Sequence, residues 1–288
     1  MSTGFKLFHL FNQTSSVVAP AWAAKYAVNL FITPRRFRPK EWELEHEKTA
    51  TRFQVKEGLS ALRWKPSRSL QNGKKVLLVH GWEGRATQMA SFVPSLLDQG
   101  YEVLTTDMPG HGHSTGKQSD IAFFADAIIE MEAQEGQFDT VIAHSMGGPS
   151  TAWAVKKGLN VNNLIFVSSP SRMDMVLKRF AGFIGLRAYA ADLFVEFMSK
   201  HVGISARDID TVKLLENYQG RLMLVHDEGD QEVSVFQSQR VADEMSEAEL
   251  IITQNLGHRR ILGSEEIIAK TTSFIEKDIL SDTQQNTG

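Results

Sequence analysis

The sequence contains no cysteine, and this absence limits the kinds of site that it can form. Without cysteine there is neither a disulfide framework nor a thiolate-ligated metal site. The composition suits a reducing compartment, so we expect a cytoplasmic protein. The formal net charge of −3 over 288 residues gives no reason to expect nucleic acid as a partner.

Long apolar runs and cofactor motifs are missing as well. A membrane-spanning helix needs about 20 consecutive apolar residues. The nearest approach, residues 15–32, is interrupted by Pro20 and Lys25, so we expect no stable membrane span. No G-x-G-x-x-G or Walker pattern follows a predicted strand. We therefore expect no nucleotide or other resident cofactor.

An apolar stretch near the N-terminus predicts a helix over residues 21–32. Lys25 and Asn29 are four residues apart and share one face of that helix. One interpretation is a helix packed on the body of the protein. The other is a helix that joins two copies, or that contacts a membrane surface peripherally through residues 17–32.

The segment after this helix is basic. Pro34 is expected to end the helix. The run at 35–39, which holds three arginines, is expected to be solvated. Taken together, residues 1–50 are expected to form a helical segment packed on the core.

Strand and helix signals alternate along the rest of the chain. Short runs typical of strands lie at 51–55, 60–65, 75–79, 101–106, 140–143, 164–168, 221–225 and 249–253. Helical patterns lie at 89–99, 119–131, 150–157 and 261–279. This alternation predicts an α/β fold with a doubly wound, mostly parallel sheet of about eight strands.

One interval interrupts the alternation. Residues 171–217 carry no strand signal but many methionine and phenylalanine residues. We expect a small helical cap over the carboxyl edge of the sheet, inserted in a single domain over 51–280. The apolar residues of the cap are equally suited to its own core and to a hydrophobic substrate. Residues 281–288 are expected to form a disordered tail.

The chain is organised around residues 141–148, where an apolar strand meets a small-x-Ser-x-Gly turn and then a helix. A serine at such a corner, here Ser145, would project its hydroxyl above the sheet beside a helix N-terminus. Ala143 and Gly147 are small enough for the close backbone approach that the corner requires. This pattern predicts a nucleophile.

Acyl transfer by a serine also needs a base, an orienting acid and oxyanion donors. His258 follows the last strand and is the candidate base. Asp230 is the candidate acid, with Asp227 and Glu228 in the same loop as alternatives. The carboxyl ends of parallel strands meet at one crevice, so these side chains are expected to converge there.

Oxyanion donors are expected from the backbone N–H groups of Met146, after the nucleophile, and of Trp82, in a His-Gly-Trp loop. Histidines occur elsewhere too. His80, His111 and His113 with Asp107 would be the candidates for a metal site. Their Pro-Gly and Gly-His steps are typical of loops, so no metal is expected. His144 is interpreted as a packing or hydrogen-bonding residue.

Five motifs in this order resemble the α/β-hydrolase superfamily, from about Leu62 to the last helix. They are His80-Gly81-Trp82, Asp107 to Ser114, the elbow at Ser145, Asp230 and Gly257-His258. The order serine, acid, histidine is that of this fold. The resemblance, closest to serine esterases and lysophospholipase-like members, implies Ser145 as nucleophile, His258 as base and Asp230 as acid.

The favoured hypothesis is a serine hydrolase that cleaves carboxylic esters, with a hydrophobic acyl group and a small ester or lipid-like molecule as substrate. The alternative is a ligand-binding or signalling protein that keeps the three residues but turns over little. Thioesterases, C–C hydrolases and acyltransferases share the fold and stay open, because the sequence does not define the bond that is cleaved. A homodimer also stays open.

Overall fold

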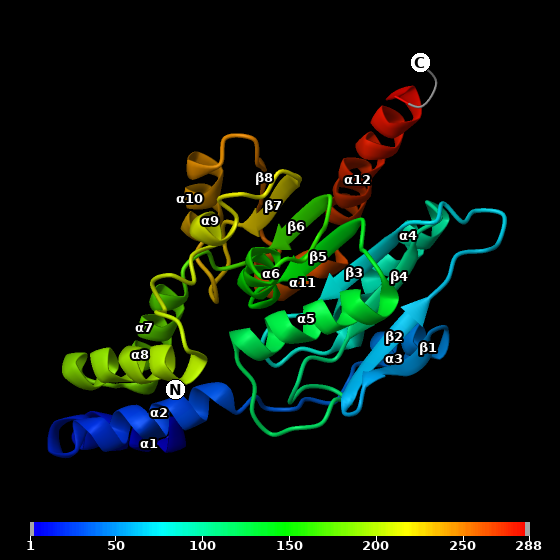
Figure 1. The fold of residues 1–288 in the computed structure, drawn as a ribbon. Helices are drawn as coiled ribbons and strands as arrows, with labels where there is room; N and C mark the ends of the chain where they lie inside the picture. Colours follow the sequence, from blue (N-terminus) through cyan, green and yellow to red (C-terminus); the bar gives the residue numbers. More distant parts are fainter. Residues whose placement is uncertain (1–2, 286–288) are drawn as a thin grey trace.

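A single eight-stranded sheet runs through the protein, as the computed structural model shows for the residues that it describes, 3–285 (Figure 1). The strand order is β1-β2-β4-β3-β5-β6-β7-β8. β1 and β2 form an antiparallel hairpin, β2 pairs antiparallel with β4, and all other pairs are parallel. The strands are β1 Thr51–Lys56, β2 Leu59–Trp64, β3 Lys75–Val79, β4 Glu102–Thr106, β5 Thr140–His144, β6 Asn163–Val167, β7 Arg221–Asp227 and β8 Glu249–Thr253.

Helices cover both faces of this sheet, because its central strands are apolar on both sides. In β3, Leu77 and Val79 belong to one buried cluster, with α5 (Ile121–Glu135) and α6 (Gly147–Lys156). Val76 and Leu78 belong to a second cluster on the other face, with α4 and α12. The predicted doubly wound, mostly parallel sheet is confirmed. The remaining helices on these faces are α4 Val93–Asp98, α10 Phe236–Glu244, α11 Gly257–Arg260 and α12 Glu265–Gln285.

Two predicted helices begin later than expected. The pattern at 89–99 divides into a 3₁₀ turn, Ala86–Phe92, and then α4, which has proline in its first turn. Proline lacks an N–H and is favoured at such a helix start. The pattern at 261–279 likewise opens with a 3₁₀ turn, Ile261–Gly263, before α12 begins.

The end of α12 corrects the expected disordered tail. The helix continues to Gln285, so residues 281–285 are helical. Acidic residues in its first turn favour the positive end of the helix dipole, and no glycine or proline interrupts the pattern before Gln285. The last three residues of the expected tail, 286–288, lie outside the described residues.

Two groups of helices lie together at the carboxyl end of the sheet (Figure 1). The first is the N-terminal pair, α1 (Thr3–Val18) and α2 (Pro20–Ile32). The second is the cap, in which three helices fill the predicted insertion. They are α7 Met173–Ile184, α8 Ala188–Val202 and α9 Thr211–Leu214. α2 packs along α8, so the N-terminal pair adjoins the cap. Within the described residues, no helix combines the length and hydropathy needed to cross a bilayer.

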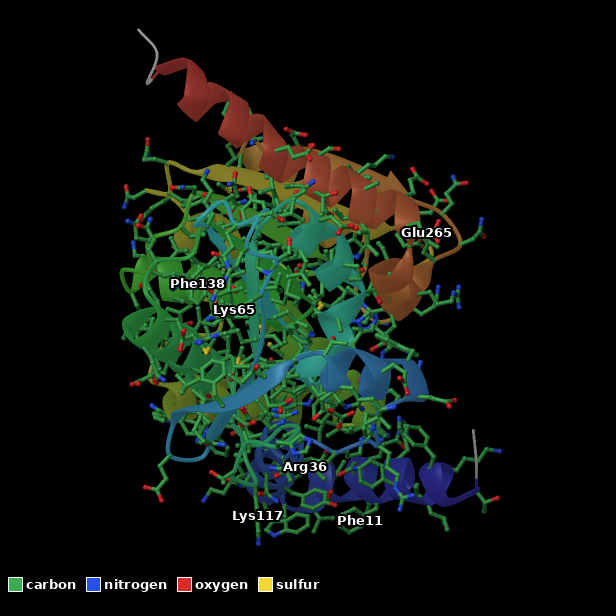
Figure 2. The ribbon with its side chains drawn as sticks, turned by 90° about the vertical axis from the view of Figure 1, so that its right-hand side faces the viewer. Phe11, Arg36, Lys65, Lys117, Phe138 and Glu265 are labelled. Atoms are coloured by element: carbon green, nitrogen blue, oxygen red, sulfur yellow. The ribbon has the colours of Figure 1, made fainter. Side chains whose placement is uncertain are left out.

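The segment after α2 is bound to the protein rather than solvated, which corrects the expectation for 35–39. Arg36 donates to the carbonyl oxygens of Gly110, Gly112, Ser114 and Gly116 at 2.8–3.1 Å. A planar guanidinium has five donors and can hold several loop carbonyls together. Figure 2 shows Arg36 where the N-terminal helices meet the body of the molecule. The segment continues into α3 (Glu41–Lys48).

Candidate active site

Ser145 lies on a tight corner between β5 and α6. Its φ is +52°, a left-handed conformation that is uncommon for a residue with a side chain. Its N–H donates to Val167 O at 2.9 Å. A Cβ on Gly147 would lie 2.8 Å from Val79 O, and a Cβ on Gly81 would lie 2.7 Å from the Cβ of Ser145. The end of β3 and the corner at Ser145 therefore lie so close together that both positions require glycine.

The structure brings Ser145, His258 and Asp230 together at the carboxyl edge of the sheet. His258 Nε2 lies 3.0 Å from Ser145 Oγ, and His258 Nδ1 lies 2.7 Å from Asp230 Oδ2. Asp230 follows β7, and His258 lies in α11, which follows β8. The geometry allows the imidazole to accept the serine proton while the carboxylate orients the ring.

Asp230 is buried but well supplied with donors. Its Oδ1 accepts the backbone N–H groups of Glu232 and Val233 at 2.7 and 2.8 Å. Burial raises the pKa of the Asp230 carboxyl, but hydrogen bonds from His226 and His258 outweigh it and hold the pKa well below its usual range. The carboxylate is therefore an anion at neutral pH, as an acceptor beside imidazole must be.

The two alternative acids lie elsewhere. Asp227 accepts from the N–H of Gly229, the hydroxyl of Thr253 and the N–H of Leu256, each at 2.9 Å. It thereby ties the end of β7 to the loop that carries His258. Glu228 is exposed to solvent. Of the three carboxylates, only that of Asp230 forms a described bond to the imidazole of His258.

His144, beside Ser145, holds the backbone of His258. Its Nε2 lies 2.8 Å from His258 O, so this nitrogen carries a proton and donates. Burial and the nearby charge of His258 lower the pKa of His144 to about 3, so the ring is neutral at physiological pH. The two rings are 4.7 Å apart. Only its position next to the serine signals this role in the sequence.

The candidate oxyanion donors lie beside the serine. Neither the N–H of Trp82 nor that of Met146 donates to another described residue. Met146 is the N-cap of α6, so its N–H lies at the positive end of that helix. Both residues line the same pocket as Ser145. Two unoccupied N–H groups beside a nucleophile are what stabilisation of an oxyanion requires.

Two buried histidines brace the loop of Trp82. His80 Nε2 accepts the N–H of Met108 at 3.0 Å, and His111 Nε2 accepts the N–H of Glu83 at 3.1 Å. Burial lowers the pKa of His80 to about 4 and that of His111 to about 3. Both rings are neutral, and their lone pairs are used by backbone donors. Their role in this structure is to join the loops after β3 and β4.

A pocket of about 490 Å³ opens above Ser145 and His258. Its walls come from α2, from α7 and from the loop before α10. Phe31 of α2 contributes to it and stacks on Trp82 at 5.8 Å. The other lining residues are mostly apolar: Trp82, Met146, Pro170, Met175, Val176, Arg179, Phe180, Phe183, Gln231, Glu232, Val233, Ser234 and Gln237. Sequence reasoning missed Phe31, because nothing in the α2 pattern indicates that the helix reaches the site.

Residues 76–270, more than half of the chain, match the alpha/beta hydrolase family. The chain belongs to this family. The match begins with β3, so α1 and α2 lie outside it. The fold and the order of the motifs along this chain agree with the family assignment.

Relatives of known name include peroxidases, hydrolases and esterases. The chain is 34% identical over 83 residues to a non-heme chloroperoxidase of Kitasatospora aureofaciens, covering 28% of this chain and 30% of that protein. It is 34% identical over 91 residues to a serine hydrolase-like protein of Danio rerio, covering 30% and 26%. The chain thus matches less than a third of the length of these curated relatives.

The fold also resembles that of an esterase of Pyrococcus furiosus. The TM-score is 0.61 at 19% identity, over 85% of this chain and 99% of that one. At this identity the likeness concerns the fold alone.

Proposed function

We propose that the protein is a serine hydrolase that cleaves carboxylic esters through an acyl-enzyme. One observation carries the proposal. A hydrogen-bonded chain from Asp230 through His258 ends at the hydroxyl of Ser145, which faces an apolar pocket. The match to a serine hydrolase-like protein supports the same reaction class.

In the first step, Ser145 Oγ attacks the ester carbonyl carbon and His258 Nε2 takes the hydroxyl proton. The resulting imidazolium is stabilised by the anionic Asp230. The carbonyl oxygen becomes an oxyanion and accepts the N–H groups of Trp82 and Met146. Losing one such donor typically raises the barrier by about 2.7–4 kcal/mol.

In the second step, His258 gives its proton to the leaving alcohol and the C–O bond of the ester breaks. Water then attacks the acyl group on Ser145, with His258 as base. The proton returns to Ser145 Oγ as the acid leaves, so the enzyme is restored. Throughout, the bond from His144 to His258 O supports the loop that carries the imidazole.

The pocket supports a hydrophobic acyl group. Phe180 and Phe183 of α7 and Phe31 of α2 provide apolar walls. Burying one methylene contributes about 0.8 kcal/mol, so chain length should change kcat/KM until the pocket is filled.

The test is turnover of p-nitrophenyl esters with acyl chains from two to twelve carbons. Ser145→Ala should reduce kcat at least about 10⁴-fold. Ser234→Ala, which changes another serine of the pocket, should retain most of the activity. Equal rates for the wild type and Ser145→Ala would remove the proposal.

Labelling separates catalysis from binding. A fluorophosphonate probe should form an adduct on Ser145 and none in Ser145→Ala, as read by mass spectrometry. A folded wild type without an adduct would instead indicate a ligand-binding protein. Comparing matched p-nitrophenyl esters and acyl thioesters then identifies the preferred bond, since both pass through the same acyl-enzyme.

A further inference from the structure

Helix α1 exposes many apolar side chains for a surface helix. Its fully buried residues are polar, Asn12 and Ser16, and among its large apolar side chains Phe8 packs against the core. The exposed set, between 48% and 79% accessible, is Leu7, Leu10, Phe11, Val17 and Val18. Their spacing of three, four and seven residues puts them on one side of the helix. Figure 2 shows Phe11 at the outer edge of the molecule.

Aromatic residues of α2 extend this face. Trp22 is half exposed and stacks on Tyr26, with ring centroids 5.5 Å apart. Phe11 meets both rings edge to face, at 5.9 and 6.2 Å. Tryptophan and tyrosine are enriched where one end of a side chain is apolar and the other is hydrated. We call the residues Leu7, Leu10, Phe11, Val17, Val18, Trp22 and Tyr26 the N-terminal face.

The charge around this face has one sign. Residues 1–40 contain six lysines and arginines and no aspartate or glutamate, while the whole chain has an acidic excess of −3. Lys6 and Lys25 are exposed, and neither forms an ion pair with another described residue. Arg35 instead pairs with Glu83, and Arg36 donates to loop carbonyls. The face is therefore apolar with basic residues at its edge, and the rest of the molecule is acidic.

Helix α1 also contacts a wall of the active-site pocket. Phe5 of α1 lies 5.2 Å from Phe183 of α7, between ring centroids. Phe183 is itself exposed and lines the pocket above Ser145. The helix that carries the N-terminal face therefore packs beside the pocket.

We propose that the N-terminal face docks on an anionic lipid surface, with α1 lying in the plane of the interface. Amphipathic helices bind there through apolar burial and attraction of basic residues to acidic lipids. A second copy of the chain fits less well, because a symmetric contact would oppose two basic faces. The acidic remainder of the molecule would be repelled by the same lipids, which favours contact through the N-terminal face.

The proposal does not depend on turnover, so it is tested on vesicle binding. Full-length protein is floated with vesicles of phosphatidylcholine alone or with about 30% phosphatidylglycerol. We expect binding to the anionic vesicles that weakens with salt. Leu10→Glu should lower the partition coefficient at least about tenfold, since it puts a charge into the apolar layer. Leu70→Glu, at a leucine that is 47% exposed and lies between β2 and β3, should bind like the wild type.

Charge and control variants complete the design. Lys6→Glu with Lys25→Glu should abolish the preference for anionic vesicles. Ser145→Ala should bind normally, which separates docking from the proposed reaction. Circular dichroism melting checks that each variant is folded. Wild type that floats with neither vesicle would overturn the proposal. So would a dimer in light scattering that Leu10→Glu dissociates, since a second copy would then cover the face.

Discussion

The carboxyl edge of the sheet and the α1–α2 pair differ in how their buried polar groups are bonded and in how far their apolar side chains are exposed. At the sheet edge, the carboxylates of Asp227 and Asp230 are held by several partners each. Asp230 accepts from His258 and from two backbone N–H groups. In α1, Asn12 is buried with an Oδ1 that has no partner among the described residues, while leucine and phenylalanine face outward. The first region is organised by contacts within the chain, and the second exposes an apolar surface for which we propose a contact outside it.

The largest effect should separate the two aspartates of the β7 loop. Asp230→Asn should lower kcat about 10⁴-fold with little loss of stability, because the ring of His258 loses its orienting anion. Asp227→Asn should cost about 1–3 kcal/mol of folding free energy and leave kcat within about tenfold. The measurements are ester turnover and urea unfolding of both variants. A reversed order would assign the acid role to Asp227.

A smaller loss of kcat is expected from a substitution at Gly81, which follows β3 and lies against Ser145. Gly81→Ala puts a methyl group 2.7 Å from Ser145 Cβ. Relief of this clash should displace the serine, cost about 1–3 kcal/mol and lower kcat about 100-fold. The matched control is Gly182→Ala in α7, where the space is open and helix propensity favours alanine. If both variants keep wild-type kcat, the corner tolerates more than the geometry suggests.

Acid should weaken the sheet edge through its neutral histidines. In the unfolded chain each histidine binds a proton below about pH 6.5. In the folded protein the pKa of His80 is about 4 and those of His111 and His144 about 3, with burial as the main cause. The unfolded state thus binds more protons between these limits. Each ring should therefore decrease the free energy of unfolding, and so destabilise the fold, by about 1.4 kcal/mol for each pH unit that the pH falls.

This slope can be measured between pH 6 and pH 5. The depressed pKa of Asp230 acts in the same direction, but mainly below about pH 5, where its unfolded carboxyl begins to protonate. The histidines therefore dominate the slope in this window. His144→Gln should reduce the slope by about one proton in urea unfolding. An unchanged slope in that variant would mean that His144 is charged in the folded protein.

The smallest effect is expected on the N-terminal face. Leu10→Gln should change the free energy of unfolding by less than about 0.5 kcal/mol, because its side chain is already 58% exposed. Leu78→Ala, in the core of β3, should cost about 2–5 kcal/mol. Thermal melts of both variants compare the contribution of a buried leucine to stability with that of an exposed one. Strong destabilisation by Leu10→Gln would show that α1 is packed inward.

Much of the fold could be predicted from the sequence because the strands are short apolar runs followed by distinctive loops. Val76 to Val79 is apolar on both faces, as a central parallel strand must be. The elbow was recognisable because a left-handed corner accepts few residues next to Ser145. The order of motifs then placed His258 and Asp230 at the same edge.

The rest depends on contacts that local patterns do not encode. α1 was predicted only as part of a helical segment over 1–50, since its buried Asn12 and Ser16 and exposed apolar residues give no ordinary amphipathic pattern. The basic run was expected to be solvated, whereas the Arg36 guanidinium finds four carbonyls more than seventy residues away. Choosing among the acids of the β7 loop required coordinates, because Asp227 and Asp230 differ only in which neighbours they meet.

Phe31 gives the pocket a wall from outside the 76–270 region that defines the family. Under the proposed function, exchange of this one helix near the start of the polypeptide should change substrate selectivity while Ser145, His258 and Asp230 stay in place. Replacement of the segment before Pro34 by recombination would then give the same fold a new substrate preference without any change to these three residues.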